Sequence, residues 1–171
     1  MSEIGIGITA LLQMGDVLAP GAKINLDKAM TVQHFSYACS KRRTAAGNPY
    51  GPTMPSFLEF TVRLGKKDDA KEFFEQMHQP ETFQYSFLFY SKSGTGAVEE
   101  NSIIVASGYT VGLEESTRTV TIIEQVTDKD GKKTEVPKDD EQLHLTVKVM
   151  LSNLVIKSKD SKNLNLIITN D

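Results

Sequence analysis

The sequence predicts a single β-barrel of about seven to nine strands with one short α-helix near the middle of the chain. Three observations lead to this fold class. Most segments alternate apolar and polar residues with a period of two, as half-buried strands do. One segment has a helical period instead. No linker, repeat or shift in composition divides the 171 residues, so residues 1–171 are expected to form one domain with its own core.

Three strands are expected before the helix. The first lies within residues 4–12, although two glycines weaken its pattern. The second is residues 32–39, where Phe35, Tyr37 and Cys39 share a face after one irregularity that follows Val32. The third is residues 57–64, with an unbroken inward set: Leu58, Phe60, Val62 and Leu64.

The connection between the second and third expected strands is unusually long. It spans residues 41–55 (KRRTAAGNPYGPTMP), whereas most connections between paired strands have about two to five residues. It begins with three cations and contains Pro49, Pro52 and Pro55. Such a segment is either disordered or docked, and the prolines favour docking because they lower the entropy that docking costs. We therefore expect residues 41–55 to be docked rather than disordered, and the acidic chain makes carboxylates a better target for the three cations than nucleic acid.

Residues 67–79 are expected to form the helix. Four apolar residues recur at helical spacing and would form its buried face: Ala70, Phe73, Phe74 and Met77. Asp69, followed by Glu72 three residues later, resembles a capping box at the N-terminus of the helix. Pro80 ends the helix, because proline cannot supply the backbone donor that a further turn needs.

Five strands are expected after the helix. They are residues 83–89, 102–112, 119–127, 143–151 and 164–168. The fourth is the clearest, with Leu143, Leu145, Val147, Val149 and Leu151 inward. This alternation places His144 on the outer face. The segments 91–101 and 128–141 are rich in glycine, serine or charge, and are expected to be solvated tips.

Composition excludes several partners. The formal net charge of −3 argues against nucleic acid, because binding to a phosphate backbone needs a surplus of cations. No segment reaches the length of about 20 apolar residues that a membrane span requires, and the N-terminus lacks the basic start of a signal peptide. We expect a chain that is made in the cytoplasm and does not insert into a membrane. The single cysteine, Cys39, is expected to be a reduced thiol in the core.

No catalytic, cofactor or metal site is expected. His34, His78 and His144 lie far apart, and none has a second ligand at metal-binding spacing. Residues 65–67 (GKK) resemble the end of a phosphate-binding loop, but the first glycine of that motif is missing. The acidic pairs lie in loops or at the start of the helix, away from a cleft that would shift a pKa. The residues therefore give no support for an enzyme.

The strands on either side of the helix carry modest polar residues on their outward faces. These are Glu59, Thr61 and Arg63 on the first strand, and Gln84 and Ser86 on the second. Such faces are normally exposed to solvent and have no further function. They can also line a solvated channel when subunits close into a ring.

The order of these elements resembles the hemolysin-coregulated protein (Hcp, TssD) family, the tube subunits of type VI secretion systems. The resemblance is strongest to the divergent branch found in Bacteroidetes, and it covers roughly residues 32–151 and the tail strand. The matching features are Phe35-Ser36-Tyr37, a loop with Arg43, Gly47, Asn48, Tyr50 and Gly51, the strand 57–64, and a helix ending in Phe73-Phe74-x-x-Met77. Residues 1–25 are longer and richer in glycine than the family pattern, and residues 128–141 form an unusually charged insertion.

The resemblance implies a β-barrel with a short helix on one side and a structural, non-enzymatic function. Members of the family assemble into hexameric rings, and the rings stack into a tube that a contractile sheath propels, sometimes with effectors inside. Contractile phage tail tubes share this fold. The implied partners are other copies of the chain, sheath, spike and baseplate components, and effector proteins. The implied route out of the cell is the secretion machine itself, without a signal peptide.

The resemblance also implies roles for individual residues. Residues 41–55 would be an arm that reaches across a neighbouring subunit or the next ring. Its contact residues would be Arg42, Arg43, Asn48 and Tyr50. Glu59, Thr61, Arg63, Gln84 and Ser86 would face the lumen of the ring.

Two other classes of function remain as hypotheses. A monomeric β-barrel could bind a small apolar or saccharide ligand, which requires an internal cavity. The inward residues Phe60, Phe83 and Phe87 are large enough to fill a small barrel, which counts against such a cavity. A hydrolase would require a nucleophile or an acid pair, and the sequence offers neither.

Overall fold

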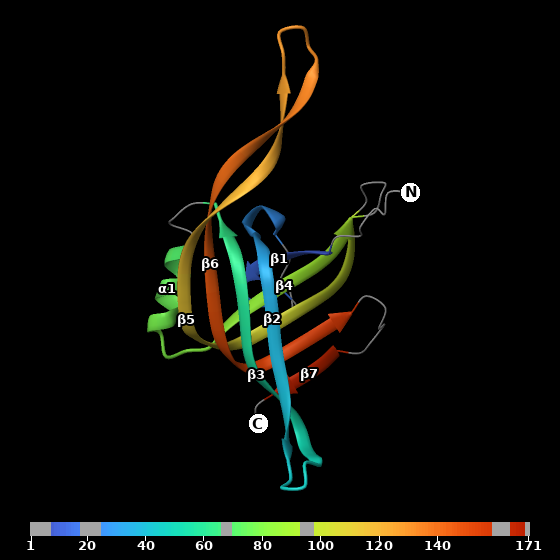
Figure 1. Ribbon diagram of the computed structural model, residues 1–171. Coiled ribbons are helices and arrows are strands. Elements are labelled where there is room, and N and C mark those ends of the chain that lie inside the picture. The colour runs from blue at the N-terminus through green and yellow to red at the C-terminus, as the bar shows by residue number, and fades with distance from the viewer. Residues whose placement is uncertain (1–7, 18–24, 66–69, 93–97, 159–164, 170–171) are drawn as a thin grey trace.

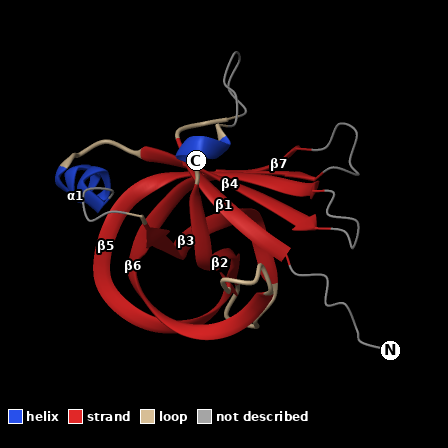
Figure 2. Ribbon diagram, turned by 90° about the horizontal axis from the view of Figure 1, so that it is seen from above, coloured by secondary structure: helices blue, strands red, loops and turns tan. Residues whose placement is uncertain are grey.

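The computed structural model describes residues 8–17, 25–65, 70–92, 98–158 and 165–169. Its elements are β1 (Ile8–Met14), a short 3-10 helix η1 (Leu26–Lys28), β2 (Met30–Arg43), β3 (Pro49–Leu64), α1 (Lys71–His78), β4 (Phe83–Lys92), β5 (Val98–Thr127), β6 (Lys133–Ser158) and β7 (Asn165–Thr169). Neighbouring strands are antiparallel, in the order β3-β2-β1-β4-β5-β6-β7, and β3 also pairs with β6. This pairing closes the sheet into a barrel with β7 added beside β6 (Figures 1 and 2). The predicted fold class is confirmed.

The interior of the barrel is apolar, as the alternating pattern predicts. The inward residues of β3 and β6 are fully or almost fully buried: Leu58, Phe60, Val62, Leu64, Leu145, Val147, Val149 and Leu151. The ring of Phe60 packs against those of Phe73, Tyr85 and Phe87, with centroids 6.3, 5.3 and 5.1 Å away. Each fully buried side chain of this size contributes roughly 1.5–3 kcal/mol. Large side chains therefore fill the space that an internal ligand would need.

Helix α1 lies outside the barrel and is attached to it by a buried polar cluster. The hydroxyl of Tyr85 on β4 donates a hydrogen bond to the side-chain oxygen of Gln76 and lies 2.7 Å from the hydroxyl of Thr110 on β5. The rings of Phe73 and Tyr85 are stacked, with centroids 6.4 Å apart. Burial raises the pKa of Tyr85 to about 12, so its hydroxyl remains protonated as a donor. The cluster therefore fixes the helix to two strands.

The structure corrects the predicted buried face of the helix. Phe74 and Met77 are 41% and 43% exposed, whereas Gln76 is buried because Tyr85 supplies its hydrogen-bond partner. Helical spacing alone did not reveal that a glutamine would replace two apolar residues on this face. The predicted capping residue Asp69 lies outside the described residues. The residue before the helix makes no side-chain cap.

The structure also corrects the boundaries at 91–101, 102–127 and 128–141. Residues 102–112 and 119–127 belong to one strand of 30 residues, β5, and β6 begins at Lys133 within the predicted loop. The two strands pair continuously as far as Thr127 and Lys133, so only a tight turn separates them. Residues 117–143 thus form a two-stranded extension, named here the β5–β6 arm. In the segment 91–101, β4 runs to Lys92 and β5 starts at Val98; residues 93–97 lie outside the description.

The long connection at residues 41–55 is likewise a hairpin and not a loop. β2 and β3 pair as far as Arg43 and Pro49, and the turn between them is closed by a hydrogen bond from the Thr44 N–H to the Asn48 carbonyl at 2.9 Å. Gly47 in this turn has φ +84°, a conformation that side chains disfavour. Residues 41–55, named the β2–β3 arm, project from one end of the barrel, and the β5–β6 arm projects from the other (Figure 1).

Candidate assembly surfaces

The four predicted contact residues of the β2–β3 arm lie together in its outer half. Arg42 is paired with Tyr50 across the hairpin, and Arg43 with Pro49. The backbone N–H of Asn48 donates to the hydroxyl oxygen of Thr44 at 3.2 Å, so Asn48 also helps to close the turn. Both arginines are exposed, as is Tyr50 at 49%, and the arm contains no acidic residue. Among the described residues, no ion pair neutralises these cations. Their contact with another subunit remains a prediction.

The three predicted lumen residues on β3 form a polar row on the outer face of the barrel. Glu59 forms an ion pair with Lys148 on β6 at 3.7 Å and lies 3.9 Å from the His34 ring on β2, which gives a polar band across three strands. Thr61 is only 6% exposed, and its hydroxyl lies 2.9 Å from that of Thr146. In this chain, therefore, the exposed members of the row are Arg63 and, in part, Glu59.

The two predicted lumen residues on β4 belong to a different part of the surface. Strand β4 lies three positions from β3 in either direction around the closed sheet, so Gln84 and Ser86 do not continue the β3 row. Ser86 is 2% exposed, because the segment after β1 covers it. Its hydroxyl donates to the Gly15 carbonyl oxygen at 2.5 Å and accepts from the Val17 N–H at 3.1 Å. Gln84 is exposed.

His144 lies on the outer face of β6, as the alternation predicts, opposite the inward Leu145 and paired with Arg63 of β3, but it is buried there. It is 3% exposed, and a chain of polar contacts leads from it to the surface. Its Nε2 lies 3.2 Å from the Gln142 side-chain oxygen, and the Gln142 amide donates to Asp140 at 3.1 Å. Its Nδ1 has no hydrogen-bond partner. Burial and, secondarily, the positive charges of Arg118 and Arg63 lower the pKa of His144, so the neutral form is favoured.

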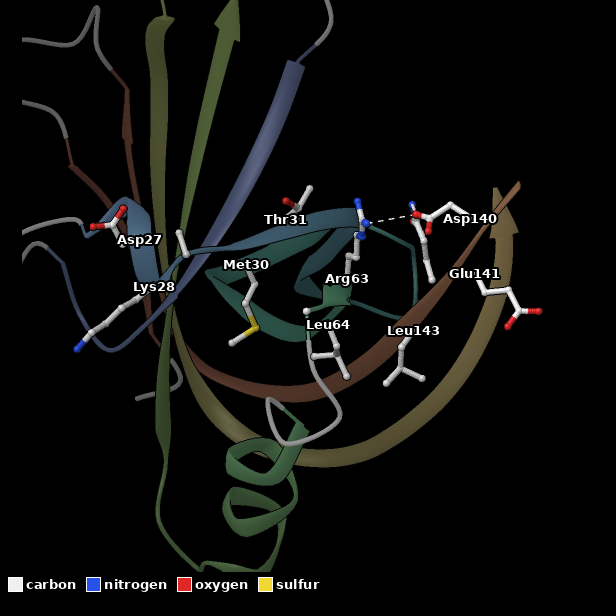
Figure 3. Close-up of a pocket in the computed structure, with 12 residues that line it drawn as sticks. Asp27, Lys28, Met30, Thr31, Arg63, Leu64, Asp140, Glu141 and Leu143 are labelled. Atoms are coloured by element: carbon white, nitrogen blue, oxygen red, sulfur yellow. Dashed lines mark hydrogen bonds and ion pairs between the residues drawn. The ribbon is translucent and has the colours of Figure 1, made fainter. Parts of the chain in front are cut away.

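A cleft of about 790 Å³ lies where the β5–β6 arm joins the barrel (Figure 3). It is lined by η1, the start of β2, the end of β3, and residues 140–143 of β6. Arg63 and Asp140 meet beside it, with 3.4 Å between their nearest side-chain nitrogen and oxygen. Both side chains are partly solvated, so this ion pair contributes only about 0.2–1 kcal/mol. The cleft is an open, polar depression at the root of the arm.

The β5–β6 arm is a surface that the sequence did not predict as a unit, because residues 119–127 were expected to be a strand and residues 128–141 a solvated tip. Five large apolar side chains of the arm are at least 37% exposed: Val120, Ile122, Ile123, Val126 and Val136. The alternation of residues 119–127 was a usable signal, but without knowledge of the partner strand it did not show that both strands leave the barrel. This arm coincides with the charged insertion noted in the sequence.

Other candidate chemistry is sparse in the part of the chain that the structure describes. It contains no group of three or more histidine, cysteine or acidic side chains that could hold a metal ion. Within the same residues, no helix is long and apolar enough to cross a membrane. Cys39 packs against the core but is only half-buried, and burial raises the pKa of its thiol. Such a thiol is a poor nucleophile.

Comparisons with known proteins identify the fold. No family model matches the sequence, and no curated protein matches it. The structure matches solved structures of Hcp proteins over nearly the whole of both chains. Secreted protein Hcp3 from Pseudomonas aeruginosa is 8% identical, with a TM-score of 0.60 and coverage of 96% of this chain and 99% of that chain. Hcp1 from Flavobacterium johnsoniae is 16% identical, with a TM-score of 0.56 and coverage of 95% and 99%. The chain therefore has the Hcp fold.

Proposed function

We propose that this chain is a structural subunit of a type VI secretion or related contractile injection tube. It works by assembling into hexameric rings that stack, and it carries effectors passively through the central pore. The observation that supports this most strongly is the Hcp fold over 96% of the chain, with nearly complete coverage of the matched structure. Its partners are other copies of itself, the sheath, spike and baseplate of the machine, and effector proteins.

The exposed arms fit a protein that functions by assembly. The β2–β3 arm offers Arg42, Arg43, Asn48 and Tyr50 to a neighbour, as proposed from the sequence. A two-stranded hairpin that projects alone into water is only marginally stable, so a hairpin of this length fits a contact with another molecule. The ring leaves the cell through the machine itself, so an export signal on this chain is not required.

The lumen surface proposed here is narrower than the five residues named from the sequence. Glu59 and Arg63 on β3 form its centre, continued on β6 by Lys148. Gln84 lies on another sector of the barrel, and Thr61 and Ser86 are buried within the subunit. A wall of alternating, mutually paired charges suits a channel that must let cargo pass without holding it tightly.

The oligomeric state tests the proposal directly. Native mass spectrometry and negative-stain microscopy of the purified chain are expected to reveal sixfold rings with a central pore. Replacing residues 42–51 by an Asn-Gly turn is expected to disperse the rings while the barrel remains folded by circular dichroism. A chain that stays monomeric at high concentration in several salts would overturn the proposal.

A pair of charge reversals gives a matched control for the arm. Arg42→Glu with Arg43→Glu should weaken rings. In the unmodified chain both cations would face carboxylates of a neighbour, and the introduced glutamates would repel those carboxylates. Lys132→Glu with Lys133→Glu makes the same change of charge at the tip of the other arm, and should leave rings intact. Equal effects of the two pairs would show that net charge, and not the β2–β3 contact, controls ring formation.

The monomeric ligand-binding alternative gains no support from the barrel. Its interior is filled by Phe60, Phe87 and Tyr85, all 0% exposed. No described residue points to an enclosed site with convergent polar groups. Loss of residues 42–51 separates the two hypotheses, because a monomeric ligand-binding barrel would keep its oligomeric state.

A further inference from the structure

The β5–β6 arm has two unlike faces. Paired residues alternate between them, so the even-numbered positions of both strands share one face. This apolar face consists of Val120, Ile122, Val126 and Val136, which are 37–47% exposed. The charges beside them neutralise each other, since Lys138 and Glu124 approach to 3.2 Å. The opposite, polar face carries mainly threonines and acidic residues, with Ile123 opposite Pro137 as its apolar interruption.

An amphipathic ribbon of this kind is incomplete in isolation. A two-stranded hairpin without further packing is marginally stable in water. Antiparallel strands that alternate apolar and polar residues normally place the apolar face against another layer. Within the described chain, no other element covers the arm beyond its root (Figure 1). We therefore expect another molecule to cover the apolar face.

A second exposed apolar surface lies at the opposite end of the barrel. Met150 on β6 is paired with Tyr109 on β5 and with Phe57 on β3, so the three side chains stand side by side across three strands. They are 56%, 45% and 56% exposed, and Val111 nearby is 52% exposed. These four residues are named the Phe57 patch. Contiguous aromatic and aliphatic exposure of this kind marks interaction sites.

The charges around the two surfaces are opposite in sign. The Phe57 patch lies at the root of the β2–β3 arm, whose residues 41–43 are three cations with no acidic residue in the arm. The β5–β6 arm, residues 117–143, contains seven acidic and five basic side chains, a net charge of −2. The end that carries the β2–β3 arm is thus apolar and basic, and the end that carries the β5–β6 arm is apolar and acidic.

We propose that the apolar face of the β5–β6 arm docks on the Phe57 patch of a second copy placed end to end, with its acidic residues beside that copy's basic β2–β3 arm. A second copy is the occupant that satisfies both surfaces at once, because each chain brings one surface of each kind. Such a head-to-tail contact leaves a free surface at either end and therefore propagates. The inference rests on the proposed function in that it supplies the contact between successive rings, at the rim of the pore, because Phe57 and Met150 share a face of β3 and β6 with Glu59 and Lys148.

Chemical cross-linking tests the contact without requiring long filaments. In a Cys39→Ser background, Ile122→Cys combined with Met150→Cys is treated with a short bismaleimide, which tolerates a small error in register. A ladder of covalent oligomers on a denaturing gel is the expected result. The matched control replaces Ile122→Cys by Gln125→Cys, which lies on the polar face of the same ribbon. No ladder in the first variant, or equal ladders in both, would overturn the proposal.

Substitutions on the two faces test the contribution to stacking. Val120→Asp with Ile122→Asp is expected to shorten ring stacks under negative stain and to lower the stacked fraction about tenfold or more, as for a truncated interface anchor. Thr119→Asp with Gln125→Asp adds the same charge to the polar face and should change stacking far less. Unchanged stacking in the first variant would contradict the docking.

The same experiments separate this inference from the proposed function. If the unmodified chain forms no rings, the proposed function fails, whereas a cross-linked ladder would still establish the end-to-end contact. If rings form but the Ile122/Met150 pair gives no ladder, the proposed function stands and the docking is wrong. Cross-linking of the Ile122→Cys arm solely to a different protein of the machine would also reject the second copy as the occupant.

Discussion

The β2–β3 arm and the β5–β6 arm are both two-stranded extensions of the barrel, and they leave it from opposite ends (Figure 1). The β2–β3 arm is basic, contains three prolines and exposes one large apolar side chain, Tyr50. The β5–β6 arm is acidic and exposes five large apolar side chains. The β2–β3 arm is compatible with exposure to water, because it is charged and its prolines make it stiff. The β5–β6 arm has an apolar face that only another layer can satisfy.

The two arms also differ in how they are rooted. The β2–β3 arm follows register shifts near Cys39 and Ser40, where the prolines of β3 interrupt regular pairing. The β5–β6 arm continues the barrel strands in unbroken register from Leu113 to Thr127. Strain or motion at its root is therefore transmitted along a continuous ladder. This contrast leads to predictions in which the core that both arms share, the turns, one histidine and one ion pair are changed in turn.

The largest effect is expected from Leu145→Ala. Leu145 is 0% exposed on β6, between β3 and β5, so it supports strands of both arms. The cavity should lower the free energy of unfolding by about 2–5 kcal/mol. Urea unfolding measures this change, and hydrogen exchange should show reduced protection in β3, β5 and β6, whose residues surround Leu145. Lys148→Ala, on the outer face of the same strand, should stay within about 0.5 kcal/mol. Loss of protection confined to β5 and β6 would show that β3 does not depend on this side chain.

Intermediate, local effects are expected from the turn glycines. Gly47 and Gly131 have φ +84° and +79°, in the turn of each arm. Replacing either by alanine should cost about 1–2 kcal/mol, because the left-handed conformation crowds a Cβ atom. Hydrogen exchange is expected to show opening confined to the mutated arm, with the barrel unchanged. Global unfolding at lower urea by the full amount would mean that the arm and the barrel unfold as one unit.

The sequence predicted much of the barrel for a clear physical reason. Strict alternation, as in residues 57–64 and 143–151, follows directly from one face being buried. The arms were harder to predict from the sequence. Both faces of an arm are exposed, so the burial that produces an alternating pattern is missing. Residues 128–141 were therefore interpreted as a loop, although β6 begins at Lys133.

The candidate surfaces were predictable only in part. The length, charge and prolines of residues 41–55 singled out the β2–β3 arm, and the family resemblance implied Arg42 and Tyr50 as contact residues, a role that remains a prediction. The burial of Ser86 and His144 depends on segments distant in sequence, namely residues 15–17 and the arginines beside His144. A single sequence does not specify such contacts. The Phe57 patch was missed for the same reason, because its members come from three strands.

A smaller, pH-dependent effect is expected at the root of the β5–β6 arm. The pKa of His144 is lowered from its ordinary value of 6.5, mainly by burial, so the folded chain takes up its proton at lower pH than the unfolded chain does. The stability that this histidine contributes is complete above pH 6.5 and is lost as the pH falls toward its folded pKa. His144→Gln should remove this part of the pH dependence.

Urea unfolding at about pH 7.5 and about pH 5 measures the difference. The groups that face His144 are Gln142 on its own strand, Arg63 on β3 and Arg118 on β5. His34→Gln is the control, because His34 is an exposed histidine on β2. The assignment to His144 fails if its replacement leaves the pH dependence unchanged and the control removes it.

The smallest effect is expected from the ion pair on the β5–β6 arm. Lys138 and Glu124 approach to 3.2 Å, yet their side chains are 57% and 49% exposed, so water screens most of their attraction. Glu124→Gln should change the free energy of unfolding by less than about 0.5 kcal/mol. In assembled stacks the same substitution should matter more, because docking of the apolar face would desolvate the remaining Lys138. An equal, negligible effect on stacked and single rings would place this pair outside the end-to-end contact.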